Sequence, residues 1–255
     1  LYDEGMYPFG SSSGQVVAEN SDFACRGLEL RPGKLKESEL GHDETVACHT
    51  IDTKGRDHTV VDRRLRSHIR GLHYIDESEE TEDEPPAADL LNPEAMKCFL
   101  RLVHGRYAQE LGEWFGSTIT GIFTDEPSLL GRGAPREVIP GTTGILDEVR
   151  RITGEDFSRQ MCAVFLDSEP GHREAKAKWN KAVRRRLEET YYSPMRQWCE
   201  DHGLELMGHP ESPDDLALLR WFNVPGQDLV WRWVLPGPTA TQGPQSVQAK
   251  VASSA

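Results

Sequence analysis

Hydrophobic residues recur at helical spacing in two long stretches of the chain. In residues 92–115 and 174–202, an apolar residue stands at every third or fourth position, which is the spacing of one face of an α-helix. Asn92 can cap the start of the first helix, Pro93 suits its first turn, and a glycine directly follows each stretch. The apolar stripes are Met96, Phe99, Val103, Tyr107, Leu111 and Trp114 in the first helix, and Trp179, Val183, Leu187, Tyr191, Met195 and Trp198 in the second.

Short apolar runs follow these helices and predict β-strands. STITGIFTDEP follows the first helix, LELMGHPE follows the second, and a further run, DLVWRWVL, occupies residues 228–235. Alternating helices and strands are typical of a parallel sheet. Polar residues gather at the carboxyl ends of these strands, which favours a (β/α)₈ barrel because its active site lies on that face. An open doubly wound sheet, which binds ligands at the same ends, is the alternative.

Residues 28–75 show a different pattern. Polar and apolar residues alternate in 45–51 and 58–62, which predicts strands within a charged, β-rich segment. Residues 76–84, DESEETEDE, hold seven acids in nine positions and precede two prolines, so we expect an exposed loop there.

We therefore expect an α/β protein, specifically a partial or complete (β/α)₈ TIM-type barrel with a β-rich, acidic insertion. The chain has 255 residues, close to the ~250 that are typical of such a barrel. Residues 1–27 would supply a strand end and a loop, residues 28–88 the insertion, and residues 89–255 the remaining α/β units.

Composition narrows the classes of partner. The net charge is −13, which argues against nucleic acids and anionic membranes, since both recruit basic patches. No apolar run of 18 residues occurs, so we expect no membrane span. The five cysteines are widely spaced and lack a C-x-x-C pair, which favours buried free thiols over a disulfide framework or metal site.

The two ends of the sequence indicate a fragment. The chain begins at Leu1 without an initiator methionine, and residues 237–255 resemble the start of another helix. Any targeting segment would then lie upstream, so the sequence assigns neither a localisation nor an oligomeric state.

Two adjacent acids, Asp125 and Glu126, end the strand in GIFTDEPS. If the strand continues, their side chains point in opposite directions, and Pro127 favours an extended conformation at Glu126. A carboxyl group beside an apolar wall and a second carboxylate keeps its proton near neutral pH. This pattern predicts Glu126 as a general acid and Asp125 as a residue that orients a neighbour. A helix cap or a surface loop is the alternative interpretation.

Glycoside hydrolysis needs two carboxyl groups on either side of one bond, together with residues that bind sugar hydroxyls and stack on sugar rings. Strand ends of this chain carry such residues. The candidates are Tyr2, Asp3, Glu4, Tyr7, His209, Trp231 and Trp233. The acids near the amino terminus are equally compatible with solvated charge, and the histidine with core packing. The two tryptophans are more typical of core packing than of a sugar-binding platform.

Three stretches resemble bacterial glycoside hydrolases of the α-L-rhamnosidase type, family 106, and their uncharacterised relatives. LYDEGMYPFGSSSGQVV is similar to the family's YDE-x-x-(W/Y/F)-P-S-G-x-A-G-G stretch, GIFTDEPS to its FFTDEP strand end, and WCEDHGLELMGHPE to its WCe-x-hgl-x-x-tGH element. The similarity covers most of residues 1–20 and 90–255 and is thin across 28–88.

The resemblance implies a (β/α)₈ barrel that hydrolyses glycosidic bonds, with Glu126 as a catalytic carboxyl group. For the rhamnosidases proper it also implies an inverting mechanism and a calcium ion near the sugar, although this sequence does not place the calcium ligands. The Ser11–Gly14 stretch lacks the family's doubled glycine. The second catalytic carboxylate is either Glu211 or a residue beyond Ala255, in which case the chain alone would be inactive.

Two further functions stay open. A carbohydrate-binding protein without catalysis would carry the same sugar-binding residues. A metal-dependent hydrolase would use His209, Glu211 and Asp125, although H-x-E spacing is not specific for a metal site.

Overall fold

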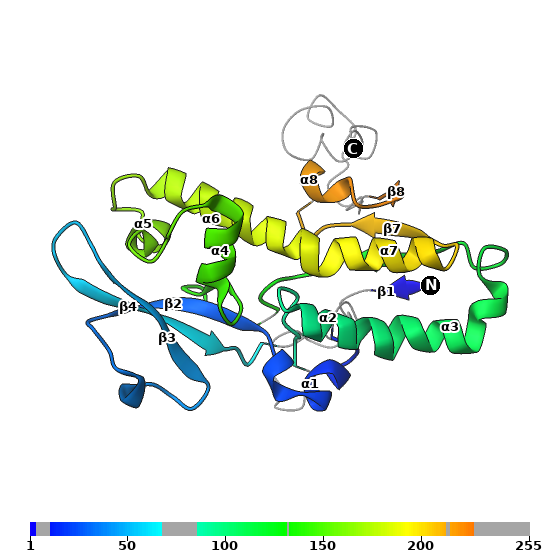
Figure 1. Cartoon of the computed structure of the whole chain (residues 1–255), viewed down its shortest axis with the longest axis horizontal. Helices are drawn as coiled ribbons and strands as arrows, with labels where there is room; N and C mark the ends of the chain where they lie inside the picture. Colours follow the sequence, from blue (N-terminus) through cyan, green and yellow to red (C-terminus); the bar gives the residue numbers. More distant parts are fainter. Residues whose placement is uncertain (4–10, 68–85, 132, 213–214, 227–255) are drawn as a thin grey trace, which may run out of the picture.

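The computed structural model describes residues 1–3, 11–67, 86–131, 133–212 and 215–226. Two sheets lie at different ends of an elongated molecule, and long helices run between them (Figure 1). The acidic run at 76–84 and four of the candidate sugar-binding residues lie outside the described residues. These four are Glu4, Tyr7, Trp231 and Trp233.

The first sheet is parallel and has the order β1-β5-β7-β8. Its strands are β1 (Tyr2–Asp3), β5 (Gly121–Asp125), β7 (Glu205–His209) and β8 (Val224–Pro225). The strands predicted in GIFTDEPS and LELMGHPE are therefore confirmed. Because all four strands run in one direction, the ends of β5 and β7 meet at the same edge of the sheet.

The second sheet is antiparallel and has the order β3-β4-β2-β6. Its strands are β2 (Arg26–Pro32), β3 (Glu44–Ile51), β4 (Asp57–Arg64) and β6 (Ile139–Gly141). The strands predicted from alternation in 45–51 and 58–62 are confirmed as β3 and β4. Short 3₁₀ turns, η1 (Ser21–Phe23) and η2 (Glu37–Glu39), flank β2.

The helix predicted over 92–115 is interrupted by a π-helical turn. It consists of α2 (Pro93–Phe99), the π turn η3 (Leu100–His104), α3 (Gly105–Leu111) and the 3₁₀ turn η4 (Gly112–Trp114). Asn92 caps it through its side chain, as predicted. The extra residue of a π turn rotates the following turns. The apolar stripe is therefore buried only up to Val103, and Trp114 is exposed.

The helix predicted over 174–202 also contains a π turn. It consists of α6 (His172–Leu187), η5 (Glu188–Tyr192) and α7 (Ser193–Asp201). Here the stripe stays buried through Met195, because its residues recur at a spacing of four, and Tyr192 is buried in addition. This long helix begins beside α4 (Ile145–Thr153) and α5 (Met161–Phe165) and ends beside β7 (Figure 1). The remaining helices are α1 (Gln15–Glu19) and α8 (Leu216–Leu219).

The expected barrel is wrong. Within the described residues, β1 and β8 form the two edges of the parallel sheet and do not pair with each other. A barrel needs eight parallel strands, and the described residues supply four. The reason lies in the connections: β2, β3, β4 and β6 join the antiparallel sheet, and the segment from β6 to β7 is described as helices and loops.

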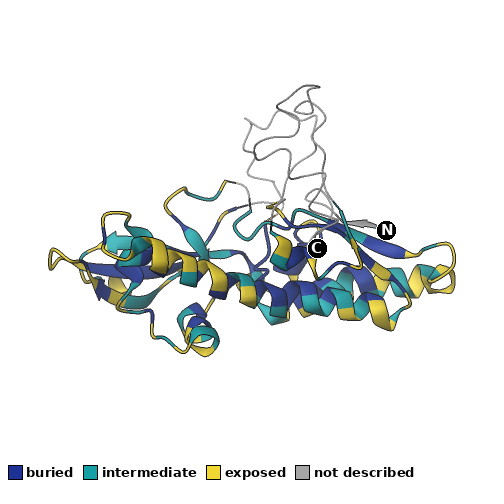
Figure 2. Ribbon diagram, turned by 90° about the horizontal axis from the view of Figure 1, so that it is seen from above, coloured by how far each residue is buried: buried dark blue, intermediate teal, exposed yellow. Residues whose placement is uncertain are grey.

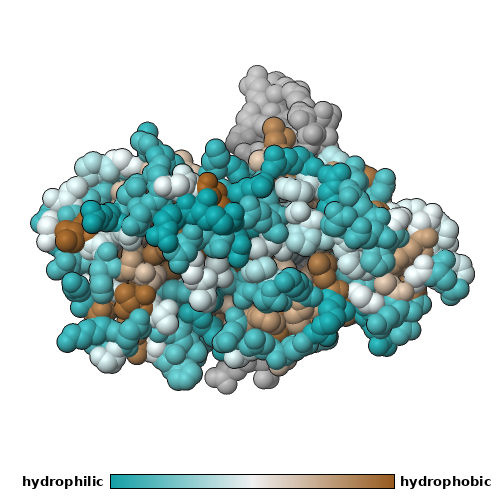
Figure 3. Space-filling model, in the orientation of Figure 1, coloured by the Kyte–Doolittle hydropathy of each residue, from teal (hydrophilic) through white to brown (hydrophobic). Residues whose placement is uncertain are grey.

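One large apolar core joins residues from both sheets and from the helices, with Trp179, Tyr191 and Phe99 among its largest members. Buried positions line the inner faces of the long helices (Figure 2). The face seen in Figure 3 is mostly hydrophilic, with small separate hydrophobic areas. All five cysteines are free thiols, four of them buried, as predicted. No helix in the described part of the chain has the length and apolarity needed to cross a membrane.

Candidate active site

The candidate site lies where β5 and β7 end side by side. Asp125 and His209 are the last residues of these strands and are register partners in the parallel ladder. The Asp125 carboxylate oxygen Oδ1 lies 3.0 Å from the Nε2 atom of His209. The ladder alone thus brings together one acid and one histidine that are 84 residues apart in the sequence.

Glu126 adopts a left-handed backbone conformation with φ = 49°. The extended conformation expected before Pro127 is therefore wrong at this position. The Glu126 N–H group donates a hydrogen bond to the His209 carbonyl oxygen at 3.2 Å, which holds the turn against β7. Non-glycine residues with positive φ are uncommon and carry strain of roughly 1–3 kcal/mol, so the surrounding structure must stabilise this turn.

The turn at Glu126 places both acids in one cluster. One ligand-type atom from each of Asp125, Glu126 and His209 lies within 4.8 Å of the others. The expectation that the two acids point in opposite directions assumed a continuing strand, whereas β5 ends at Asp125. We call these three residues the strand-end cluster.

Gly208 allows the strands to approach closely just before the cluster. Its φ is 126°, a region that is available essentially only to glycine. A Cβ atom at this position would lie 1.9 Å from the Thr124 carbonyl oxygen. The Gly-His pair at the end of β7 is the sequence signal for this feature, but the sequence does not show which strand lies opposite it.

A buried pair of hydroxyl groups lies behind the cluster. The Thr124 Oγ1 and Tyr191 hydroxyl oxygens are 2.9 Å apart, and both residues are fully buried. Tyr191 comes from the π turn η5, so this contact ties the long helix to β5 one residue before Asp125. The sequence placed Tyr191 in the core stripe but gave no indication that its hydroxyl group contacts the candidate site.

The surroundings of His209 favour its protonated form. Burial lowers the pKa of His209, but a hydrogen bond and the negative charge of Asp125, together with the Pro210 carbonyl group and the charge of Glu126, raise the pKa above its ordinary value. The residue as a whole is only 3% exposed. The cluster therefore favours a positive charge on His209, which pairs with the carboxylate of Asp125.

Glu211 lies beyond β7 and is exposed at the level of the whole residue. Desolvation by the surrounding chain nevertheless raises the pKa of its carboxyl group, while a hydrogen bond with Ser128 lowers it. Ser128 is two residues after Glu126, so the loops that follow β5 and β7 are in contact. The metal-dependent alternative predicts a ligand set of His209, Glu211 and Asp125. Within the described residues, the potential ligand atoms that gather include Glu126 in place of Glu211.

The structure places β1 beside the cluster. Tyr2 pairs with Phe123 and Asp3 with Thr124, so the backbone of Asp3 lies at the same edge of the sheet as Asp125. Of the expected sugar-binding residues within the described ranges, Asp3 and His209 thus come to one edge.

Comparisons with known proteins find a similarity in fold. No protein-family model matches the chain, and no curated protein matches it. A rhamnosidase from Novosphingobium sp. PP1Y resembles 68% of this chain with a TM-score of 0.51 and 14% sequence identity. The matched region spans 16% of the rhamnosidase chain. At this identity the similarity concerns the fold alone.

Proposed function

We propose that this chain contributes to a glycoside hydrolase site, in which carboxyl groups at the ends of β5 and β7 act on a glycosidic bond. The observation that carries the proposal is the gathering of Asp125, Glu126 and His209 at the carboxyl edge of a parallel sheet. Ligands bind at this edge in open α/β sheets. The fold similarity to a rhamnosidase supports the class of reaction, with α-L-rhamnosides or related glycosides as substrates.

The two carboxyl roles of glycoside hydrolysis suit different residues here. One group must donate a proton, and the other acts as a base or nucleophile. The raised pKa of Glu211 favours the protonated form that a donor needs. Glu126 belongs to the cluster with His209 and is the carboxyl group left for the second role. We therefore assign proton donation to Glu211 and the ionised role to Glu126, the reverse of the role expected for Glu126 from the sequence.

Asp125 and His209 take the role of substrate positioning. Their contact at 3.0 Å fixes the histidine ring, and both residue types form hydrogen bonds with sugar hydroxyls. The buried Thr124–Tyr191 hydroxyl pair holds the end of β5 behind them. This division assigns a task in one reaction to Glu211 and to each residue of the strand-end cluster.

The test compares Glu126→Gln with Glu137→Gln in the natural full-length protein. Both substitutions replace a carboxylate by an amide, and Glu137 is exposed in the loop that precedes β6. A screen of aryl glycosides, including aryl α-L-rhamnosides, first identifies a substrate. With that substrate we expect Glu126→Gln to lower kcat by about 10²–10⁴-fold. Glu137→Gln should leave kcat unchanged. Circular dichroism checks that both variants fold.

Two outcomes would overturn the proposal. Undiminished turnover of Glu126→Gln would remove the central residue from the reaction. Binding of oligosaccharides by the wild-type protein without any hydrolysis would favour the alternative, a carbohydrate-binding protein that lacks catalysis.

A further inference from the structure

We infer that the strand-end cluster binds one divalent transition-metal ion, of the zinc or manganese type, through Asp125, Glu126 and His209. The inference does not depend on the proposed hydrolase activity. It goes beyond that activity because it assigns a ligand to residues that the reaction would otherwise use only as acids, bases or hydrogen-bonding groups.

The spacing of the donor atoms is the first argument. Ligand bonds to such ions are about 2.0–2.2 Å long, so neighbouring ligands lie about 3.0 Å apart in octahedral geometry and about 3.4 Å apart in tetrahedral geometry. The Nε2 atom of His209 and the Oδ1 atom of Asp125 are 3.0 Å apart. The three donors lie within 4.8 Å of one another, so side-chain movements of about 1–2 Å would bring all of them onto one ion.

The histidine is oriented as a metal ligand is. Its Nδ1 atom lies 3.3 Å from the Pro210 carbonyl oxygen, which can only accept a hydrogen bond. In the neutral imidazole, which is the form that binds a metal ion, this contact places the hydrogen on Nδ1 and leaves the lone pair of Nε2 facing Asp125. Metal-binding histidines usually donate their second N–H group to a carbonyl or carboxylate group in this way.

The contact between His209 and Asp125 is also compatible with a bound cation. A nitrogen lone pair and a carboxylate oxygen at 3.0 Å repel each other unless a proton or a metal ion lies between them. A metal ion that replaces the proton would accept both donor atoms as ligands.

The donors are held in place before an ion arrives. His209 is 3% exposed, and the edge of its ring contacts Phe123, with 6.1 Å between the ring centroids. The left-handed turn at Glu126 and the close approach at Gly208 fix the backbone of both strands. Asp125 stays 23% exposed, which leaves a path for an ion and for further ligands.

The chemistry of the donors does not fit calcium. Calcium takes six to eight oxygen ligands, whereas these residues offer two carboxylates and one imidazole nitrogen. Imidazole nitrogen suits zinc, iron, nickel and copper, and carboxylates add manganese to this range. The calcium ion implied by the resemblance to the rhamnosidases is therefore not accommodated by these three residues.

Metal binding would also constrain the proposed reaction. A carboxylate that ligates an ion stays ionised, so Glu126 could not donate a proton while the ion is bound. Proton donation would then fall to Glu211, and this consequence alone rests on the proposed function. Three protein ligands leave positions on the ion for water or for sugar hydroxyls.

Calorimetric titration of the chelator-treated full-length protein with ZnCl₂, MnCl₂ and CaCl₂ tests the inference. We expect one site that binds Zn²⁺ or Mn²⁺ more tightly than Ca²⁺. Asp125→Asn, Glu126→Gln and His209→Gln should each weaken that site about 10- to 100-fold or more. His58→Gln is the matched control. The Nε2 atom of His58 lies 3.3 Å from a carboxylate oxygen of Asp52, and the described residues bring no third ligand to this pair.

The conservative Asp125→Asn variant keeps the test valid if replacement of the buried histidine prevents folding. No binding of Zn²⁺ or Mn²⁺ would overturn the inference, as would tighter binding of Ca²⁺ or equal affinity in Asp125→Asn and wild type. Loss of hydrolysis in Glu126→Gln with unchanged metal binding would overturn the inference and leave the hydrolase proposal intact. Unchanged hydrolysis in Glu126→Gln with weakened metal binding would overturn the hydrolase proposal and leave the inference intact.

Discussion

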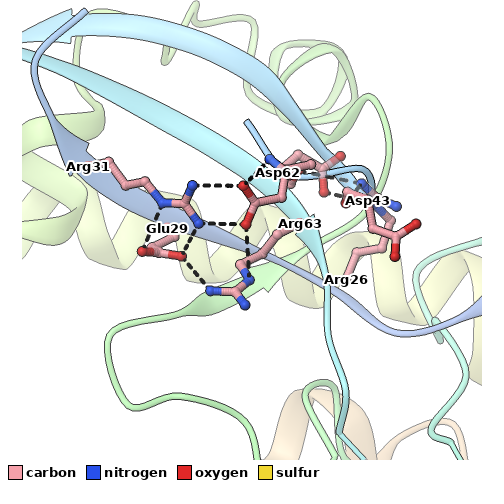
Figure 4. A network of polar contacts seen from close by, with 8 residues as sticks. Arg26, Glu29, Arg31, Asp43, Asp62 and Arg63 are labelled. Atoms are coloured by element: carbon pink, nitrogen blue, oxygen red, sulfur yellow. Dashed lines mark hydrogen bonds and ion pairs between the residues drawn. The ribbon is translucent and has the colours of Figure 1, made fainter. Parts of the chain in front are cut away.

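Both sheets carry charged residues on their strands, but they use them differently. On the antiparallel sheet, Arg31 contacts both Glu29 and Glu44 at 2.6–3.0 Å. Arg63 contacts Glu29 at 2.7 Å, and Arg26 contacts Asp62 at 2.8 Å (Figure 4). We call these residues the charged network. It consists of Arg26, Glu29, Arg31, Glu44, Asp62 and Arg63.

The charged network lies on regular strands, whereas the strand-end cluster lies on irregular backbone. Three arginines face three acids in the network, and its residues lie on strands that pair with one another. In the cluster, two carboxyl groups and one histidine gather where β5 ends in a left-handed turn and where β7 contains a glycine with positive φ. Alternation along a strand is enough to pair charges for stability. A cluster held by irregular backbone instead suits the binding of a cation or a polar substrate.

The largest expected effect comes from Gly208→Ala. The new Cβ atom would lie 1.9 Å from the Thr124 carbonyl oxygen, and φ = 126° is unfavourable for alanine. We expect the free energy of unfolding to fall by about 4 kcal/mol or more, measured by urea denaturation. This variant tests whether the parallel sheet depends on the backbone irregularity that forms the cluster.

Gly33→Ala, next to β2 of the antiparallel sheet, is the control for that experiment. Its φ is also positive, at 85°, but nothing lies within 4 Å of the added Cβ atom. A loss of about 1–2 kcal/mol is expected there. Equal losses at the two glycines would mean that the close approach of β5 and β7 is not a special constraint.

Much of the local structure follows from sequence periodicity, whereas the assembly of the sheets does not. Both long helices and the strands at β3, β4, β5 and β7 follow from apolar spacing and alternation. The barrel does not form in the described residues because β6 pairs with β2 rather than with the parallel strands. That choice depends on contacts between distant segments, which periodicity does not encode.

The sequence indicates the residue types of the candidate site but not their geometry. Asp125, Glu126 and His209 stand at or directly after the ends of predicted strands. Pro127 argued for an extended Glu126, but the hydrogen bond from its N–H group to His209 stabilises a left-handed turn. The π turn that presents Tyr191 to Thr124 has no clear sequence signal, since π turns differ from α-helix by a single inserted residue.

Asp89 provides a second test, because it is a buried acid that makes no ion pair with an arginine in the described part of the chain. Burial raises its pKa to about 7, against hydrogen bonds from Thr142 and the Leu91 N–H group; Asp62 raises it further and Arg26 lowers it. The folded state therefore holds the proton more tightly than the unfolded state. Stability should fall as the pH rises from about 4 to about 7, by an amount on the order of a few kcal/mol.

Asp89→Asn should remove this part of the pH dependence and stabilise the protein at pH 8. An asparagine side chain can accept from the Leu91 N–H group and donate to Thr142. Urea denaturation at pH 5, 6, 7 and 8 measures the effect, with the exposed Asp167→Asn as control. Parallel pH profiles for wild type and Asp89→Asn would show that the buried acid is ionised at little cost.

Tyr191→Phe should have a smaller effect. Removing its hydroxyl group leaves Thr124 Oγ1 without that bond in a fully buried position, which costs about 1–3 kcal/mol. Tyr192→Phe is an unusually close control, because the neighbouring Tyr192 hydroxyl is buried and has no hydrogen-bond partner within the described residues. Its removal should leave stability unchanged or higher. Equal losses of stability in the two variants would mean that the hydrogen bond between Tyr191 and Thr124 does not stabilise the end of β5.

The smallest expected effect concerns the charged network, and it distinguishes the two regions by their dependence on pH and salt. The hydrogen bond and charge of Arg31 hold the pKa of Glu44 at about 2, despite partial burial, with help from the Gly41 N–H group. Because the folded pKa is depressed, this stabilisation is present above about pH 4.5 and is lost as the pH falls toward 2.

A double-mutant cycle with Arg31→Gln and Glu44→Gln should give a coupling energy of about 1 kcal/mol at pH 7. That energy should shrink at high salt, because both side chains are partly exposed. A coupling that stays constant from pH 7 to pH 2 would mean that the network is held by packing rather than by charge, and the contrast with the strand-end cluster would then rest on backbone geometry alone.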